Sequence, residues 1–524
     1  MNPKLPSFIS KKVSFLAPSL GKVGMGLLLI TLGACSRVSM PDAVQTNDAV
    51  SIYPDYKDVT VPVNIAPLNF MLADSAEAVA CLSCDGKEYC YEAEDGSFHF
   101  DEGEWKELTA NAKDITVSVC TKGREGQWMQ HPDFTIHVST DSIEPYVVYR
   151  RIVPGYHKWY KMGLYQRSLE DFEETALIEN SQTENSCVNC HTFNHGDASR
   201  MVFHQRAVNP GTFLVTEVGE DTPPPLGEAG RGLSITRLDP ELGEGAEQGM
   251  VYPAWHPSGN YIAFSRNNTA QDMYAGKPLS PSRGEGRYAP EHVDTSYNRI
   301  EVFDTKSSIQ IYDIRNNRLY TTPLLSDAAK MNTFPTFTPD GKSLVYCSAD
   351  TVSMPEHFRE IRYNLVSVSF DPENGGVGDS CRVIYDAVGQ QKSALLPRFS
   401  PDGHRLLFTE ADYGTFPIWH HEADLKMLDI ESGATDSLAV VNSSDTESFH
   451  SWSQTSRWFL FSSRRDDGLF TRLYITHIDK DGKTTKPFML PQSDANYNRL
   501  LMQSYNVPEL VDSKVASPIT LPKR

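Results

Sequence analysis

The sequence has no apolar run long enough to cross a bilayer as a helix, which requires about 20 predominantly apolar residues. Its marked apolar stretch, Met25 to Ala34, is about half that length. Basic residues are also scarce, because 48 Lys and Arg stand against 68 Asp and Glu, a formal net charge of -20 at pH 7. Since no basic stripe offsets this charge, we expect neither nucleic acid nor an anionic lipid surface as a partner.

A catalytic motif is missing as well. The nucleophile elbow Gly-x-Ser-x-Gly of α/β-hydrolases does not occur, and too few residues follow the last recognisable repeat to form that domain. Carboxylate pairs contributed by different strands leave no spacing signal, so a hydrolase site built from such a pair stays open as an alternative. The sequence therefore favours a protein that is not an enzyme.

The N-terminus has the composition of an export signal. Lysines precede the apolar stretch, and Leu32-Gly-Ala-Cys35 resembles a bacterial lipobox, in which small residues come before an acylated cysteine. We expect residues 1–34 to be removed, Cys35 to carry lipid, and residues 35–50 to form a tether. This predicts a cell-envelope protein attached through its lipid to a membrane, with the outer membrane favoured. An ordinary secretory signal is the alternative.

Nine cysteines leave eight once Cys35 is acylated, and disulfides persist outside the cytoplasm. Four lie in the front part of the chain, and two disulfides are favoured there over zinc because no local histidine completes a metal site. These four are Cys81, Cys84, Cys90 and Cys120. Their pairing cannot be assigned from sequence. Cys347 and Cys381 are expected to be buried free thiols or a third bridge.

Four segments share one pattern and begin at Tyr252, Phe334, Leu396 and Phe449. The segment Phe334-Pro-Thr-Phe-Thr-Pro-Asp-Gly illustrates it: an aromatic residue, a Pro-Asp-Gly turn, and then alternating apolar residues. Proline followed by Asp or Ser and Gly favours a type I turn between two short strands. Because each unit contains four such strands, the repeat predicts the blades of a β-propeller.

The repeat is similar to the Pro-x-Trp-Ser-Pro-Asp-Gly pattern of TolB-like propellers, also described as PD40 or WD40-like repeats. The resemblance covers residues 187 to about 490 and implies that the residues before each proline line the tunnel mouth. Together with the predicted lipid anchor, a β-rich front domain and a Cys-x-x-Cys-His motif, the arrangement resembles envelope lipoproteins of Gram-negative bacteria.

We therefore predict an all-β protein in which a small β-sandwich precedes the propeller. The sandwich, with immunoglobulin-like topology as one option, is expected over residues 51–155. Residues 156–186 form a predicted aromatic-rich linker with a helix over 164–178. The propeller spans 187–510, with five readable blades and a sixth that is expected where 496–508 pairs with 160–185. A surface loop over 267–299 and a polar tail over 511–524 complete the prediction.

The segment Cys187-Val-Asn-Cys-His191 has the attachment pattern of c-type haem, in which two thiols bond to the porphyrin and the imidazole binds iron. Cys190-His-Thr-Phe193 aligns with Tyr252-Pro-Ala-Trp255, so the motif is expected to begin the first blade and to lie at the tunnel mouth. The candidates for a second axial ligand are Met250, Met331 and His450.

Two other interpretations of the motif stay open. The thiols could form a disulfide or remain free, and zinc could bind Cys187 and Cys190 together with His195 or His204. The preferred function is a non-enzymatic envelope scaffold that binds a protein or glycan partner at the tunnel mouth, with haem as a candidate cofactor. The alternative function is a redox protein in which c-type haem carries electrons.

Overall fold

The structure is a computed structural model that describes residues 38–73, 77–153, 161–217, 233–274 and 299–521. Cys35 and the predicted export signal lie outside these residues, as do most of the aromatic residues of the predicted linker. Within the described ranges, no helix combines the length and the apolar character needed to span a membrane.

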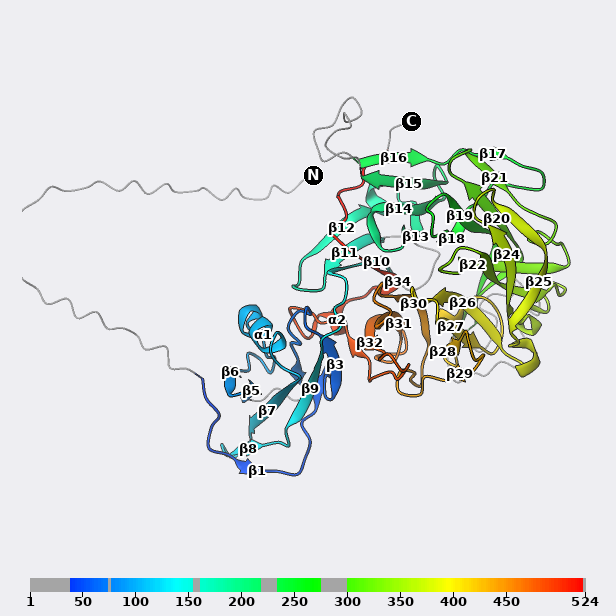
Figure 1. The fold of residues 1–524 in the computed structure, drawn as a ribbon. Helices are drawn as coiled ribbons and strands as arrows, with labels where there is room; N and C mark the ends of the chain where they lie inside the picture. The colour runs from blue at the N-terminus through cyan, green and yellow to red at the C-terminus, as the bar shows by residue number, and fades with distance from the viewer. Residues whose placement is uncertain (1–37, 74–76, 154–160, 218–232, 275–298, 522–524) are drawn as a thin grey trace, which may run out of the picture. The chain divides into compact units, whose positions relative to one another are not determined.

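Six antiparallel sheets form the blades of a propeller (Figure 1). Five follow one another along the chain. Blade 1 contains β13 (Cys187–Asn194), β14 (Asp197–Arg206), β15 (Gly211–Glu217) and β16 (Leu233–Arg237). Blade 2 contains β18 (Val251–Trp255), β19 (Tyr261–Tyr274), β20 (Arg299–Asp313) and β21 (Arg318–Tyr320), with the short β17 (Glu241–Leu242) beside β21. Blade 3 contains β22 (Lys330–Phe337), β23 (Ser343–Asp350), β24 (Asn364–Asp371) and β25 (Gly376–Tyr385).

The next two blades have the same strand order. Blade 4 contains β26 (Ser393–Phe399), β27 (Arg405–Ala411), β28 (Asp424–Asp429) and β29 (Thr435–Asp436). Blade 5 contains β30 (Glu447–Trp452), β31 (Trp458–Ser463), β32 (Arg472–His477) and β33 (Phe488–Met489). All-β architecture and a propeller of six blades are thus confirmed.

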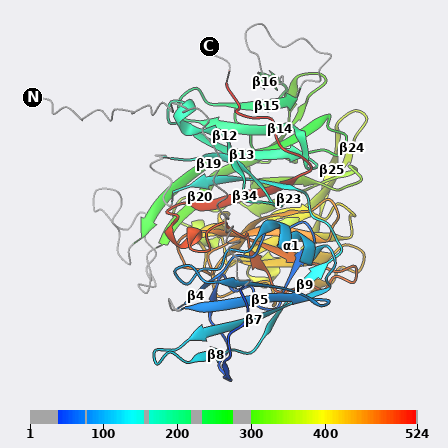
Figure 2. The same ribbon diagram turned by 90° about the vertical axis from the view of Figure 1, so that its left-hand side faces the viewer.

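The sixth blade, the closing blade, joins the two ends of the propeller. Its innermost strand β34 (Ser504–Val511) comes from the C-terminal part of the chain and pairs with β10 (Tyr146–Ile152), which continues to β11 (Gly163–Ser168) and β12 (Glu174–Glu179). Figure 2 shows β34 among the strands of the propeller. Closure by the C-terminal segment is confirmed, but its direct partner is 146–152, which sequence analysis had placed in the sandwich.

The helix predicted over 164–178 is wrong, because β11 and β12 occupy this region. Each is short, and pairing within the blade decides its conformation over local preference. The tail is not merely polar surface either: Val515 and Ile519 are buried, and the Val515 backbone exchanges two hydrogen bonds with Gln166 of β11. Both corrections enlarge the closing blade.

Each innermost strand contains one residue in the left-handed conformation, at a point where the pairing register shifts. These six residues, called the inner ring here, are Cys190, Tyr252, Phe334, Leu396, Phe449 and Val507, with φ between 45° and 55°. An extra residue in one strand of a pair bends the strand and redirects side chains. The repetition confirms the alignment of Cys190 with Tyr252 and places His191 where four blades have proline.

The front domain precedes the propeller and contains a seven-stranded mixed sheet. Five strands lie in the order β1 (Val44–Gln45), β8 (Trp128–Gln130), β7 (Asp114–Lys122), β5 (Ala78–Cys84) and β6 (Lys87–Glu92), and β9 (Phe134–Ser139) joins β7 to β3 (Val59–Pro62). A separate pair is formed by β2 (Ile52–Tyr53) and β4 (Met71–Leu72). Because seven of the nine described strands belong to one sheet and the other two form only a short pair, a sandwich of two comparable sheets is not specifically confirmed.

Helix α1 (Glu102–Thr109) was missed by sequence analysis. Its N-cap is Asp101, whose carboxylate accepts hydrogen bonds from the backbone N–H groups of Gly103 and Glu104 at 2.8 and 2.9 Å. This cap satisfies N–H groups that have no partner inside the helix. The buried Trp105 fixes the helix on the sheet by donating its indole N–H to the Ile65 carbonyl.

Blade 5 and the front domain share one hydrophobic core. Polar contacts reinforce it: the Trp458 indole donates to the Asp141 carbonyl at 3.0 Å, and His477 Nε2 lies 2.8 Å from the Asp141 carboxylate. The Tyr53 hydroxyl donates to Asp466 at 2.8 Å. The front domain is therefore held to the propeller by packing and by specific bonds.

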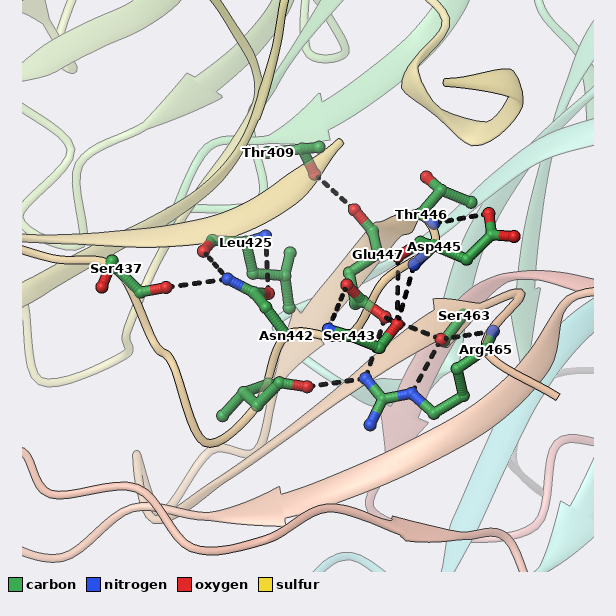
Figure 3. Close-up of polar contacts among 11 residues, drawn as sticks. Thr409, Leu425, Ser437, Asn442, Ser443, Asp445, Thr446, Glu447, Ser463 and Arg465 are labelled. Carbon is green, nitrogen blue, oxygen red and sulfur yellow. Dashed lines mark hydrogen bonds and ion pairs between the residues drawn. The ribbon is translucent and has the colours of Figure 1, made fainter. Parts of the chain in front are cut away.

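A buried carboxylate anchors blade 5 (Figure 3). The Glu447 side chain is 0% exposed and accepts from the Ser443 hydroxyl at 2.7 Å, the Ser463 hydroxyl at 2.8 Å and Arg465 Nη2 at 2.9 Å. The Ser443 N–H donates to its other oxygen at 3.1 Å. Because buried charges are costly unless paired and hydrogen-bonded, this cluster is a satisfied site.

One disulfide is present among the described cysteines, between Cys81 and Cys90 on the paired strands β5 and β6. The prediction of two disulfides is therefore half right, because Cys84 and Cys120 are free. Cys347 is buried and Cys381 is exposed, and no bridge joins them.

Candidate functional site

The propeller axis contains a cavity of about 240 Å³. All six inner-ring residues line it, so each blade contributes one side chain. Three of these are aromatic, and Phe416 adds a fourth ring. The implication that residues before each proline lie at the tunnel is thereby confirmed. We call this space the axial cavity.

The extended β19–β20 hairpin covers part of the axial cavity. Thr269 and Val302 from its two strands line the space. The hairpin is tied to blade 3 and blade 4: Glu301 accepts from Arg359 Nη2 at 2.7 Å and from the Tyr413 hydroxyl at 2.9 Å, and the Phe303 ring stacks on Phe358 at 4.5 Å. The expected surface loop over 267–299 is therefore a strand up to Tyr274, and residues 275–298 lie outside the described residues.

Three arginines line the axial cavity: Arg150 from β10, Arg206 from β14 and Arg398 from β26. Arg150 is 3% exposed, and its Nε has no hydrogen-bond partner. Among the described lining residues there is no Asp or Glu, and none of the three arginines forms an ion pair with a described residue. Sequence analysis missed this group because its members come from three blades and share no spacing.

Two buried acids lie near the arginines without forming an ion pair with them. Asp304 accepts hydrogen bonds from Asn267 and Thr269, and burial raises its pKa to about 6 although Arg206 works in the opposite direction. Glu509 accepts from the Phe193 N–H at 2.8 Å, and burial raises its pKa against the influence of Arg398. Burial also lowers the pKa of Arg398. Neither carboxyl group lines the cavity, although Asp304, with a pKa of about 6, is largely ionised at neutral pH.

The predicted haem motif is part of the same cavity. Cys187, Cys190 and His191 all line it, and no disulfide joins the two thiols. Burial raises the pKa of Cys187, with Arg150 and Arg206 opposing the rise, and burial together with Arg150 lowers the pKa of His191 to about 3. The Val148 carbonyl is close to the His191 ring, but neither ring nitrogen of His191 forms a hydrogen bond. The motif therefore presents a protonated Cys187 thiol and a neutral imidazole.

The residue types of the motif are those that a covalent haem requires, but the volume of the cavity is not. Two thiols and an unpartnered imidazole are the required groups. However, about 240 Å³ is below the 300–1,000 Å³ common for small-molecule sites, and a porphyrin is larger than most ligands of such sites. In this conformation the axial cavity does not fit haem.

The other predicted ligands are not brought to the axial cavity. Met250 and Met331 are packed in separate hydrophobic clusters, and the buried His450 has Nε2 3.0 Å from the Leu407 carbonyl. For zinc, His204 Nδ1 lies 2.9 Å from the Thr212 hydroxyl, whereas His195 lines a different pocket. No described cluster of metal-binding side chains includes Cys187 or Cys190.

The second pocket, of about 330 Å³, lies at the end of the innermost strands that carries the Pro-Asp-Gly turns. We call it the vestibule. Arg398 lines both spaces, and Glu509 lines the vestibule. The aromatic residues before the turns also line it: Trp255, Phe337 and Trp452 are buried as predicted, whereas Phe399 is half-buried.

The chain matches no known protein-family model and no curated protein. Among solved structures it is similar to a puromycin-hydrolysing peptidase from Mycobacterium tuberculosis, with 11% identity, a TM-score of 0.34, and coverage of 83% of this chain and 57% of that chain. It is also similar to the β-propeller domain of the Trilobed protease from Pyrococcus furiosus, with 9% identity, a TM-score of 0.33, and coverage of 84% and 97%.

A third similar structure is the periplasmic gluconolactonase of Pseudomonas aeruginosa, with 14% identity, a TM-score of 0.29, and coverage of 68% of this chain and 99% of that chain. The chain spans little more than half the length of the peptidase. The assignment of six blades rests on the strand pairing and not on these remote similarities.

Proposed function

We propose that the chain is a lipid-anchored cell-envelope protein, similar to TolB-like propellers, whose propeller is a binding scaffold with its ligand site in the axial cavity. The observation that carries this proposal is the convergence of all six blades on one cavity lined by aromatic and cationic side chains. The described lining residues include no carboxylate pair of the kind that propeller glycosidases use, which favours binding over hydrolysis.

The binding site is tested by filling it. At Val507, Phe is compatible with the backbone because the equivalent inner-ring positions of three blades already hold aromatic residues with positive φ. Native mass spectrometry of protein isolated from its host envelope should detect a bound small molecule in the parent and lose it in Val507→Phe. The matched control is Val440→Phe, where Val440 is 57% exposed, and it should retain the molecule.

Equal occupancy in the parent and in Val507→Phe would show that the ligand site is elsewhere. A parent without any bound mass would contradict the proposal as a whole, provided that the envelope fraction was kept in mild detergent throughout.

The anchor is tested separately. Cys35→Ala should move the protein from the membrane to the soluble envelope fraction, because acyl chains are the only strong anchor that the sequence indicates. Unchanged extraction by detergent would reject either the lipidation or its role as the sole anchor. An envelope protein or glycan as a further partner stays a prediction.

Covalent haem, and with it a redox function, is the second candidate. The observation that favours it is that Cys187, Cys190 and His191 line one cavity. When bound, such a group would supply reversible one-electron chemistry, and the three residues would hold it; the size of the cavity counts against it. After denaturation, protein from cells with haem-attachment machinery should still absorb as haem if this candidate is right, and an unmodified Cys187–His191 peptide by mass spectrometry would eliminate it.

A further inference from the structure

We infer that the ligand of the axial cavity is a small organic anion, with an apolar body of about benzene size and a carboxylate or phosphate group held by Arg150, Arg206 and Arg398. This inference rests on the proposed function and adds the chemical class of the ligand. It is carried by the positions of charged groups and by the dimensions of the cavity.

The charge of the site requires a partner. Buried guanidinium groups are normally paired with carboxylates or fully hydrogen-bonded, because transfer of an unpaired charge from water is costly. Elsewhere in this propeller Arg465 is paired with Glu447, and Arg359 is paired with Glu301. In contrast, Arg150 forms no ion pair with a described residue, and its Nε, like that of Arg359, has no hydrogen-bond partner. An anionic ligand would supply the missing acceptors.

Guanidinium groups also match the geometry of the proposed headgroup. Arginine binds carboxylate and phosphate through two parallel N–H donors, which gives strong and directional bonds. Three cations around one space would suit a monoanion or a dianion.

The remaining walls define the body of the ligand. Tyr252, Phe334, Phe416 and Phe449 form an aromatic surface, and Leu396 and Val507 add aliphatic side chains. A dry cavity of 150 Å³ is large enough for benzene. The axial cavity, at about 240 Å³, leaves additional room for one headgroup and a bridging water.

The same dimensions exclude a macromolecular segment as the occupant. The β19–β20 hairpin covers part of the space and is bonded to blade 3 and blade 4 through Glu301. A lipid chain or a folded partner would require these contacts to separate. A small molecule fits without that change.

Calorimetric titration of the mature protein in nonionic detergent tests the inference with four probes of similar size: benzoate, phenyl phosphate, benzamide and benzylamine. We expect at least one anion to bind about tenfold or more tightly than neutral benzamide, and benzylamine to bind weakest because its charge is repelled. Benzoate and phenyl phosphate distinguish a carboxylate ligand from a phosphate ester.

Variants connect the binding to the three arginines. Arg150→Met and Arg206→Met should each weaken anion binding about tenfold or more while leaving benzamide binding unchanged. The matched control Arg124→Met, at an exposed position of the front domain, should bind as the parent does. Because methionine retains much of the side-chain length, loss of packing alone would affect benzamide and benzoate equally.

The outcomes separate this inference from the proposed function. Equal binding of benzamide and the anions, with loss of both in Val507→Phe, would overturn the anion class and keep the cavity as the ligand site. Absence of measurable binding for both anions would also overturn the inference, whereas a bound native mass sensitive to Val507→Phe would still support the proposed function.

Discussion

Two buried charged sites in the same propeller are built in opposite ways. In blade 5, Glu447 is surrounded by donors and paired with Arg465. In the axial cavity, three arginines share one space with no described acidic lining residue. The cation of the first arrangement is paired with a described carboxylate, whereas the three cations of the second form no ion pair with a described residue. The comparison indicates that ionic pairing stabilises blade 5, whereas the arginines at the axis are retained at a cost in stability.

The largest effect is expected at the satisfied site. Glu447→Ala should lower the free energy of unfolding by about 3 to 5 kcal/mol, because it leaves the cation of Arg465 without its partner. Glu447→Gln, which retains an acceptor, should cost less. Chemical denaturation provides the measurement, and a loss below about 1 kcal/mol for Glu447→Ala would place this cluster among ordinary surface contacts.

The buried Asp304, which forms no ion pair with a described residue, should respond differently to pH. The pKa of Asp304 is raised by burial from an ordinary value of 3.8 to about 6, so folding favours its protonated form. Its stabilising contribution is therefore present below about pH 4 and is lost as the pH rises through about 6, on the order of 3 kcal/mol. Asp304→Asn should be more stable than the parent at pH 7 and similar to it at pH 4. A constant difference between these two pH values would exclude this titration.

In the axial cavity, removal of one positive charge should stabilise the ligand-free protein. Arg150→Met replaces an unpaired buried cation by an apolar chain and should raise the free energy of unfolding by about 1 to 2 kcal/mol while anion binding falls. The measurement is a denaturant melt of ligand-free protein. Clear destabilisation would mean that Arg150 has a structural partner equivalent to that of Arg465.

The smallest effect is expected for an exposed pair. Lys330 and Asp350 lie 2.5 Å apart on β22 and β23, with side chains that remain substantially exposed. Lys330→Ala should change stability by less than about 1 kcal/mol, since water and salt screen the pair. A larger loss of stability for Lys330→Ala would contradict the expectation that buried ion pairs contribute more to stability than exposed ones.

Local features of the sequence predicted the blades. Pro-Asp-Gly turns and alternating apolar residues act over a few residues, so the register of Trp255 and Phe337 could be predicted directly. The alignment of Cys190 with Tyr252 was correct for the same reason. In contrast, β11 has a short apolar pattern that does not distinguish a helix from a strand, and only pairing with β10 decides its conformation.

The candidate site was only partly predictable. The motif around Cys187 is contiguous, and its place at the axis followed from the repeat. Arg150, Arg206 and Arg398 could not be identified from the sequence, because a shared cavity brings together residues from three blades. His450 shows the opposite error: it occupies the repeat position of His191, but its ring is turned to the Leu407 carbonyl.

The closing blade sets the order in which this molecule can mature. Tyr146 pairs with Val511, so the ring cannot close until the segment that contains β34 has been synthesised. The last strand also supplies Val507 to the inner ring and Glu509 to the vestibule. Long-range pairing of this kind forms slowly and leaves strand edges exposed in the meantime. A chain that stops before β34 would therefore have most of its blades but an axial cavity without the Val507 wall.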